Sequence, residues 1–411
     1  MEIQEYIDQR RQIYDLFLTF IDSKEEESQS YANLIEYLEL KNIKKNTKES
    51  TYFIQLILHI SENHNRRVDF FGKIEKILLY FSDFITSNFQ SFDFFDIFQT
   101  NRRIVLFLLE NKLIPEESFT ILSIFKQKDQ NKLRFRHLYY SALKLYVGKR
   151  KRKRLEFEIS QYYQGSIESF EEKCKIGEND SYLCKLIRED LIDDFISHVS
   201  QTCLPINNFE VSSIFETNQF LLDKKPTLIE YAAFFGSIQI FKYLQMNNVE
   251  LTPSLWLYAI HGSNAEIIHF LIENHIEPKD NSYWECFEEA IKCHHNEIAD
   301  FLRENILSEK DISNFDSKFF NLIFEYQNMH FLQNDHNEYY LLNAIENNDF
   351  SFVKLLLDTK KFDVNSKITN ANTKKIFKLY FYDIMHSDFF IKFFFEFFVD
   401  IQKVQLFDEI I

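Results

Sequence analysis

Glycine and proline are scarce in this chain, which has six glycines and five prolines in 411 residues. The glycines are isolated from one another, so they cannot form a glycine-rich phosphate loop or a Gly-x-Ser-x-Gly nucleophile elbow. The scarcity of helix-breaking residues, with many apolar residues at three- and four-residue spacings, favours helices. We therefore expect an all-α fold.

Cysteine is also rare and irregularly placed. An odd number of five cysteines is poor for a disulfide framework, so reduced thiols are expected at Cys174, Cys184, Cys203, Cys286 and Cys293. Cys286 and Cys293 lie close in sequence to His294 and His295, but the Cys-x-x-Cys pair typical of zinc sites is absent. The sequence predicts no metal site.

The chain has no apolar run long enough for a membrane span. Its most apolar stretch, residues 389–399, is interrupted by Lys392 and Glu396 and is far shorter than the roughly 20 residues that a span needs. Residues 1–5 contain two acidic residues where a secretory signal would have a basic segment. We expect a cytoplasmic protein, or a nuclear one if its basic run is an import signal.

Catalytic motifs are missing as well. His59 and His64 are five residues apart, whereas the zinc-protease helix places its histidines at i and i+4 on one face. We therefore expect no catalytic residue, no cofactor and no enzymatic activity. An enzyme whose catalytic groups converge only in space remains an alternative.

Phenylalanine and tyrosine, by contrast, are abundant, with 46 and 21 copies. At such frequencies most of these side chains are expected to fill helical cores rather than bind ligands.

A repeated unit organises residues 226–302. Ala232, Ala259 and Ala290 are separated by 27 and 31 residues, and each is followed eight and twelve positions later by an isoleucine and a leucine. The alanine would let two paired helices approach closely, and the apolar pair would line the seam covered by the next unit. A recurring unit of this size indicates a stacked solenoid.

The first of these units resembles a known repeat. Its residues Thr227-x-Ile229-x-x-Ala232-Ala233-x-x-Gly236 are similar to the ankyrin Thr-Pro-Leu-His-x-Ala-Ala-x-x-Gly motif, with Leu228 in place of the proline. The wider run is similar to a domain of unknown function that accompanies ankyrin repeats in large protist protein families. The resemblance implies antiparallel helix pairs that stack into an α-solenoid and bind proteins.

The resemblance covers less than half of the chain. It includes residues 226–303, a fourth unit around Ala344 and a fifth unit around Ile187. The 54-residue gap between Ala290 and Ala344 must contain either a degenerate repeat or an insertion, within residues 305–337. Ankyrin turns use glycine at helix ends, and here we expect asparagine in its place, because asparagine tolerates the left-handed conformation. The positions are Asn247, Asn248, Asn274, Asn347 and Asn348.

Four regions follow from these patterns. Residues 1–148 are expected to be helical, as degenerate repeats or a separate domain, with single helices over Ile3–Phe20 and Val68–Ile85. Residues 149–178 form a basic linker and connecting helix, residues 179–366 the ankyrin-type repeats, and residues 367–411 an aromatic-rich helical cap.

Charge divides sharply along the chain. Residues 1–154 carry a net charge of +5 and residues 155–411 a net charge of −21. The acidic part is expected to prefer a basic partner and to bind it less rapidly at high salt.

One unbroken basic run ends the N-terminal part, at Lys149, Arg150, Lys151, Arg152, Lys153 and Arg154. Such a run can be a nuclear-import signal, a nucleic-acid contact or a helix face that is solvated or pairs with the acidic units. We favour the solvated or intramolecular alternative.

The predicted function is that of a monomeric scaffold that binds a protein partner without catalysis. The alternative is a nuclear or nucleic-acid-associated scaffold that uses residues 126–154. Position in the repeat gives the candidate contact residues, which are Glu230, Phe234, Leu257, His261, Glu288 and Lys292 on first helices and Asn248, Glu250, Pro278 and Asp280 at hairpin tips.

Overall fold

The computed structural model describes residues 3–23, 28–66, 69–88, 98, 100–113, 137–207, 209–307, 315–332, 339–347 and 349–358. Within these residues the regular structure is helical, which confirms the all-α fold, and Glu210 and Thr227 form an isolated bridge. In the same ranges, no helix is long and apolar enough to cross a membrane.

The chain divides into two compact units. One contains residues 4–349 and includes every element discussed below. The other contains residues 1–3 and 350–411, and its described part is mainly α25 (Phe350–Asp358), which buries Phe352 and Leu356. The predicted cap at 367–411 lies outside the described residues.

The N-terminal region is a series of helices, as expected. They are α1 (Ile3–Asp22), α2 (Ser28–Leu40), α3 (Thr47–Asn63), α4 (Phe70–Tyr80), α5 (Ser82–Asn88) and α7 (Arg102–Glu110), with a 3-10 turn η1 (Ile43–Lys45). The side chain of Asn46 caps α3 by accepting hydrogen bonds from the backbone of Lys48 and Glu49. The single helix predicted over 68–85 is wrong, because the chain turns at Phe81 between α4 and α5.

Residues 140–176 form three further helices, namely α10 (Tyr140–Tyr146), α11 (Lys149–Ser160) and α12 (Ile167–Ile176). The basic stretch that we expected to be a linker is therefore the start of α11. Ser166 caps α12, whose last turn ends at Gly177 in the left-handed conformation.

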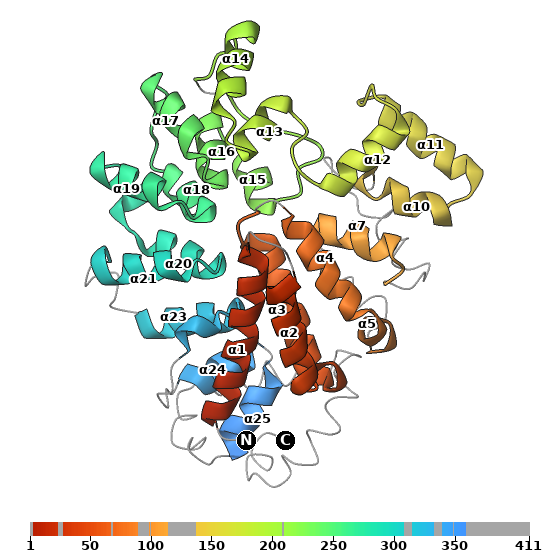
Figure 1. The fold of residues 1–411 in the computed structure, drawn as a ribbon, viewed down its shortest axis with the longest axis vertical. Helices are drawn as coiled ribbons and strands as arrows, with labels where there is room; N and C mark the ends of the chain where they lie inside the picture. The colour runs from red at the N-terminus through yellow and green to blue at the C-terminus, as the bar shows by residue number, and fades with distance from the viewer. Residues whose placement is uncertain are drawn as a thin grey trace, which may run out of the picture. The chain divides into compact units, whose positions relative to one another are not determined.

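Helical hairpins follow from residue 182 onward (Figure 1). The hairpins are α13–α14 (Tyr182–Arg188, Ile192–Thr202), α16–α17 (Leu228–Phe235, Ile238–Met246), α18–α19 (Leu255–Gly262, Ala265–Glu273) and α20–α21 (Trp284–Lys292, Asn296–Asn305). Short elements α15 (Gln219–Lys224), η2 (Lys279–Asn281) and η3 (Met329–Phe331) lie between or after them, with α23 (Phe315–Glu325) and α24 (Tyr339–Glu346) at the end.

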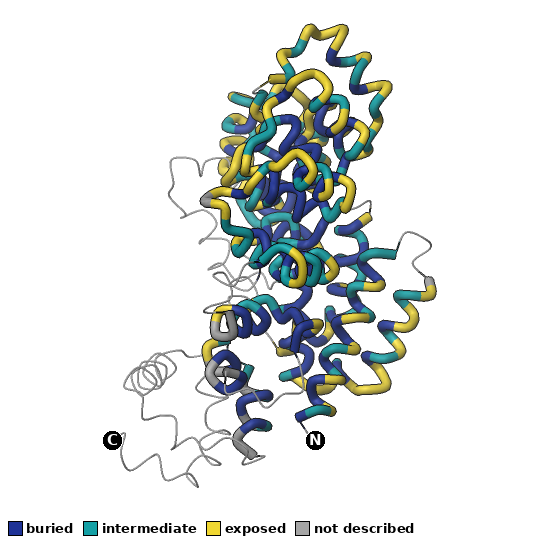
Figure 2. The backbone as a smooth tube through the Cα atoms, turned by 90° about the vertical axis from the view of Figure 1, so that its left-hand side faces the viewer, coloured by how far each residue is buried: buried dark blue, intermediate teal, exposed yellow. Residues whose placement is uncertain are grey.

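The hairpins pack in chain order. The first helices contact one another in the sequence α13, α16, α18, α20, α23 and α24, and the second helices α14, α17 and α19 do the same. We call α13, α16, α18, α20 and α23 the first-helix row. Ala232, Ala259 and Ala290 are fully buried within it. Along most helices in Figure 2 buried and exposed stretches alternate, as expected for helices that pack by one face.

Each first helix of the row ends in a similar way. A residue with positive φ follows the last helical residue within two positions, and these residues are Asp190, Gly236, Ser263, His294 and Gln327. Only one of the five is glycine, although a side chain in this conformation is strained. The prediction that asparagine replaces glycine holds for Asn248 after α17, but after α19 it is His275 that has the positive φ.

Helix α23 shows what part of the sequence between Ala290 and Ala344 forms. It packs between α20 and α24, at the place of a first helix, and is followed by Gln327 in the same conformation as in the other units. The 3-10 turn η3 comes next, where the other units have a second helix. This arrangement favours a degenerate repeat over an insertion.

Candidate functional site

Three of the six first-helix candidates are buried, namely Glu230, Phe234 and His261. The ring of Phe220, from α15, lies 5.9 Å from that of Phe234 and 4.2 Å from that of His261. The chain thus covers part of its own first-helix face. Glu230 accepts a 2.8 Å hydrogen bond from the backbone of Thr227 and so completes a capping box at the start of α16.

The remaining candidates, Leu257, Glu288 and Lys292, are partly exposed. Burial raises the pKa of Glu288, which accepts a hydrogen bond from the indole of Trp284. The Lys292 ammonium lies 3.1 Å from a carboxylate oxygen of Glu289. Contact of these three residues with a partner stays a prediction.

The hairpin tips differ from one another. Asn248 and Glu250 are exposed after α17, whereas Pro278 is buried. The side chain of Asp280 lies outside the described residues. Met246, the last residue of α17, is 74% exposed and adds an apolar group beside the first tip. We did not predict Met246, although a large apolar residue next to a polar tip is a recognisable signal. Met246, Asn248 and Glu250 are called the tip patch below.

A second set of polar residues makes contacts between units that we did not predict from the sequence. After four of the five positive-φ positions, the next residue contacts a backbone carbonyl of the preceding unit through its side chain. These contacts join Ser237 to Ile187, Asn264 to Gly236 at 2.9 Å, His295 to His261 at 3.3 Å and Asn328 to Ile291 at 3.0 Å. We call Ser237, Asn264, His295 and Asn328 the turn ladder. A polar residue at one fixed position in each of these units was the available signal.

Helix α3 ends against the turns that carry this ladder. The side chain of Asn65 donates a 2.9 Å hydrogen bond to the carbonyl of Gly262. The Nδ1 atom of His64 lies 2.7 Å from the carbonyl oxygen of Cys293, and the His64 and His295 rings are 4.9 Å apart. The N-terminal region therefore packs against the turns between paired helices, which is the end of the hairpins where the turn ladder lies.

Helix α1 continues this contact further along the row. The hydroxyl of Tyr14 lies 3.0 Å from Oδ1 of Asn328 and 3.1 Å from Nδ1 of His294. The side chain of Arg10 is only 2% exposed and pairs with Glu49 and Asp349, while its guanidinium lies over the Tyr52 ring at 3.6 Å. Removing one partner of such a desolvated pair would leave an uncompensated buried charge and would strongly destabilise the fold.

Three side chains meet where α18 and α20 pack together, of which His261 and Cys293 are buried and Glu289 is half-buried. The Nε2 atom of His261 lies 2.7 Å from Oε1 of Glu289, and the sulfur of Cys293 lies 3.3 Å from Nδ1 of the same ring. Burial opposes ionisation of Glu289, but His261 and Lys292 outweigh it and hold the pKa of this carboxyl at about 2. Burial raises the pKa of the Cys293 thiol well above its usual value. A protonated and inaccessible thiol is a poor nucleophile.

The predicted basic patch forms the first turns of α11, and all six of its side chains are exposed. Arg152 lies 3.1 Å from Glu156 and Arg154 lies 3.0 Å from Glu158, both four residues along the same helix. All three alternatives require exposed side chains, so the choice among them stays a prediction.

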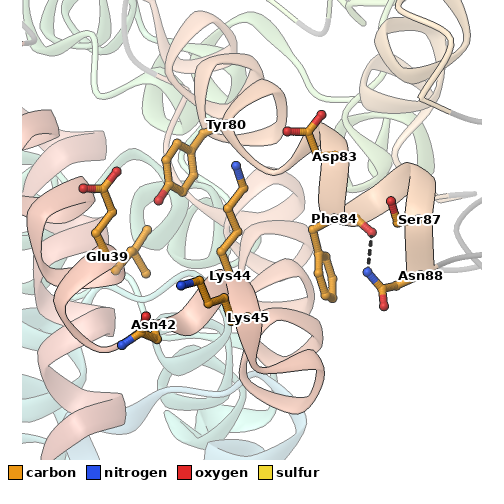
Figure 3. A pocket seen from close by; sticks show the side chains of 10 residues that line it. Glu39, Asn42, Lys44, Lys45, Tyr80, Asp83, Phe84, Ser87 and Asn88 are labelled. Atoms are coloured by element: carbon orange, nitrogen blue, oxygen red, sulfur yellow. Dashed lines mark hydrogen bonds between the residues drawn. The ribbon is translucent and has the colours of Figure 1, made fainter.

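A hollow of about 460 Å³ lies between η1 and α5, lined by Glu39, Lys44, Lys45, Tyr80 and Asp83 among others. Lys44 extends beside the ring of Tyr80, 4.5 Å from its centre (Figure 3). The two lysines are balanced by two carboxylates, so the lining favours no class of charged ligand.

No family profile, curated protein or solved structure matches this chain.

Proposed function

We propose that the chain is a protein-recognition scaffold in which residues 179–366 form an ankyrin-type solenoid. The observation that carries the proposal is the turn ladder, in which four units repeat one contact to the unit before. A contact that recurs at one position of successive units is the signature of nearest-neighbour stacking. Extended surfaces built in this way serve recognition rather than chemistry.

The partner is expected at the hairpin tips. Paired helices are antiparallel, so the tips lie at the opposite helix ends from the turns, and α1 and α3 occupy the turns. The tip patch is open to solvent and combines an exposed methionine with an acidic and an amide side chain. Together with the net charge of −21 over residues 155–411, this favours a basic protein with an apolar anchor.

Site-specific photo-cross-linking in cell lysate tests this proposal. A photoreactive residue at position 250 is expected to give a discrete adduct with a basic protein. The matched position 79, an exposed leucine of α4, is expected to give none. With the isolated partner, Glu250→Lys should slow association and weaken its salt dependence. Equal adducts at both positions, or association that ignores salt and Glu250→Lys, would contradict the proposal.

The basic patch supports a second candidate, a scaffold that binds nucleic acid or enters the nucleus. Six cations at the N-terminus of α11 oppose the helix macrodipole, and a polyanion would relieve that repulsion. Replacing all six with glutamine would flatten the slope of log affinity against log salt by up to about five if they bind duplex DNA. We expect no mobility shift of the wild-type chain at about 0.15 M salt, because its net charge of −16 opposes a polyanion.

The same glutamine variant distinguishes nuclear import from nucleic-acid binding. A fall in the nuclear fraction without any nucleic-acid binding would identify an import signal. An unchanged distribution would leave α11 as a solvated helix face.

A further inference from the structure

His261, Glu289 and Cys293 bring one potential metal ligand each to a common point. Glu289 and Cys293 are four residues apart at the end of α20, so they share one face of that helix. His261 comes from the last turn of α18, the neighbour of α20 in the first-helix row. Adjacent units therefore contribute to the same cluster.

The spacing of the three atoms approaches that of a tetrahedral site. Ligand bonds of about 2.0 to 2.3 Å at tetrahedral angles place donor atoms roughly 3.3 to 3.7 Å apart. Here the Cys293 sulfur is 3.8 Å from His261 Nε2 and 4.0 Å from Glu289 Oε1. The 2.7 Å separation of His261 Nε2 and Glu289 Oε1 is that of a hydrogen bond, and it would widen when a metal ion replaced the shared proton.

We propose that His261, Glu289 and Cys293 bind a divalent transition-metal ion, with zinc preferred. A thiolate, an imidazole and a carboxylate are the donor types that zinc accepts, whereas calcium and magnesium require an all-oxygen set. Three protein ligands leave the fourth position to water. The site lies beyond the proposed partner-binding function and does not depend on it.

The charges of the cluster suit such an ion. A thiolate and a carboxylate together neutralise a divalent cation, which a buried site requires. Lys292 is a competing cation, 3.1 Å from Oε1 of Glu289 and 3.5 Å from Oε2. Its side chain is 29% exposed, so its ammonium can stay with Oε2 or move into solvent when Oε1 binds the metal.

A metal ion here would tie α18 to α20. The carbonyl of Cys293 is also the atom that His64 contacts from the end of α3, so the ion would stabilise the turn on which the N-terminal region docks. Metal removal should therefore lower thermal stability. When metal is added back above its dissociation constant, the stabilisation should grow with the logarithm of the free metal concentration.

The test uses the purified full chain, stripped of metal and then titrated with Co²⁺ as a spectroscopic probe. One equivalent is expected to produce a thiolate-to-cobalt charge-transfer band and the intense visible bands of tetrahedral cobalt. Zinc should displace the cobalt and raise the melting temperature. Failure of the wild-type chain to produce these bands, or to retain one zinc per chain after dialysis, overturns the proposal without any variant.

Two variants and a matched control assign the ligands. Cys293→Ser should abolish the charge-transfer band, and His261→Gln should weaken metal affinity at least about 100-fold. Cys286→Ser removes another buried thiol of α20 and should leave both the band and the affinity unchanged. A band that survives Cys293→Ser, or that Cys286→Ser removes, would place the metal elsewhere and contradict this site.

Discussion

A Cβ atom placed on Gly262 would lie only 2.0 Å from the carbonyl oxygen of Ala233, so α16 and α18 meet backbone against backbone. No side chain can fit there unless the two helices separate. The close approach explains why a chain with six glycines keeps one at the end of this helix.

Gly262→Ala is expected to destabilise the chain by about 2 kcal/mol or more, through overpacking between the two helices. Denaturant unfolding followed by circular dichroism measures the effect. Gly148→Ala is the matched control, because an added Cβ at that position meets nothing within 4 Å. Equal stability of the two variants would contradict the close packing of α16 on α18.

Ala259→Phe tests the register of the repeat. Ala259 is fully buried in α18, so a phenyl ring should force its helix away from the neighbouring ones at a cost of several kcal/mol. Ala265→Phe adds the same ring to an exposed position of α19 and should change the free energy of unfolding little. An unchanged melting temperature in Ala259→Phe would rule out the stated register.

Ser263→Gly should stabilise the chain by about 0.5 to 1 kcal/mol, because glycine adopts a positive φ without the steric cost of a Cβ. Ser263 has a φ of 49°. Ser263→Ala keeps the Cβ and should give no such gain. A loss of stability in Ser263→Gly, measured by denaturant unfolding, would show that the serine hydroxyl and not the backbone decides this position.

Tyr14→Phe probes the docking of α1 on the turns. The Tyr14 hydroxyl makes hydrogen bonds with the side chains of His294, Asn296 and Asn328. Its removal would leave buried polar atoms without a partner, and we expect the free energy of unfolding to fall by about 1 to 3 kcal/mol. Tyr52→Phe is the control, since its buried hydroxyl makes no hydrogen bond. That variant should be neutral or stabilising in thermal unfolding. A similar loss in both variants would indicate general packing damage.

His59 makes the stability of the chain depend on pH. Burial lowers its pKa to about 4, below the value of about 6.5 in the unfolded chain. The unfolded chain therefore binds a proton first, so this contribution is fully present above about pH 6.5 and is lost as pH falls toward 4.

In His59→Phe the ring that meets Tyr326 edge-on is kept, but the titration is removed. Between pH 6.5 and 4 the free energy of unfolding should fall less in the variant than in the wild-type chain. The difference between the two falls should be about 1 to 3 kcal/mol, a range that allows for partial solvent access to His59. Parallel pH profiles of the two proteins would show that His59 is not the responsible group.

Much of the helical organisation was predictable from local patterns. The buried alanines of α16, α18 and α20 and the apolar pairs that follow them identify units whose period and spacing are properties of the chain itself. The boundary at Phe81 was not predictable in this way, because no proline or glycine marks it.

The candidate sites were less predictable. Phe220 covers Phe234 and His261 from outside the repeat pattern, so burial of two predicted contact residues had no local signal. The metal cluster combines His261 with residues 28 and 32 positions further along the chain, and no short-range spacing rule links them. Neither feature follows from position within a single unit.

By itself the sequence determined that the described part of the chain is helical, where the hairpins that contain Ala232, Ala259 and Ala290 lie, and how the charge divides. These properties depend on composition and short-range periodicity. Only the tertiary structure decided that α1 and α3 cover the turns of the row and that His261 meets Glu289 and Cys293. Such contacts depend on how distant segments pack, and many sequences with the same local pattern would pack differently.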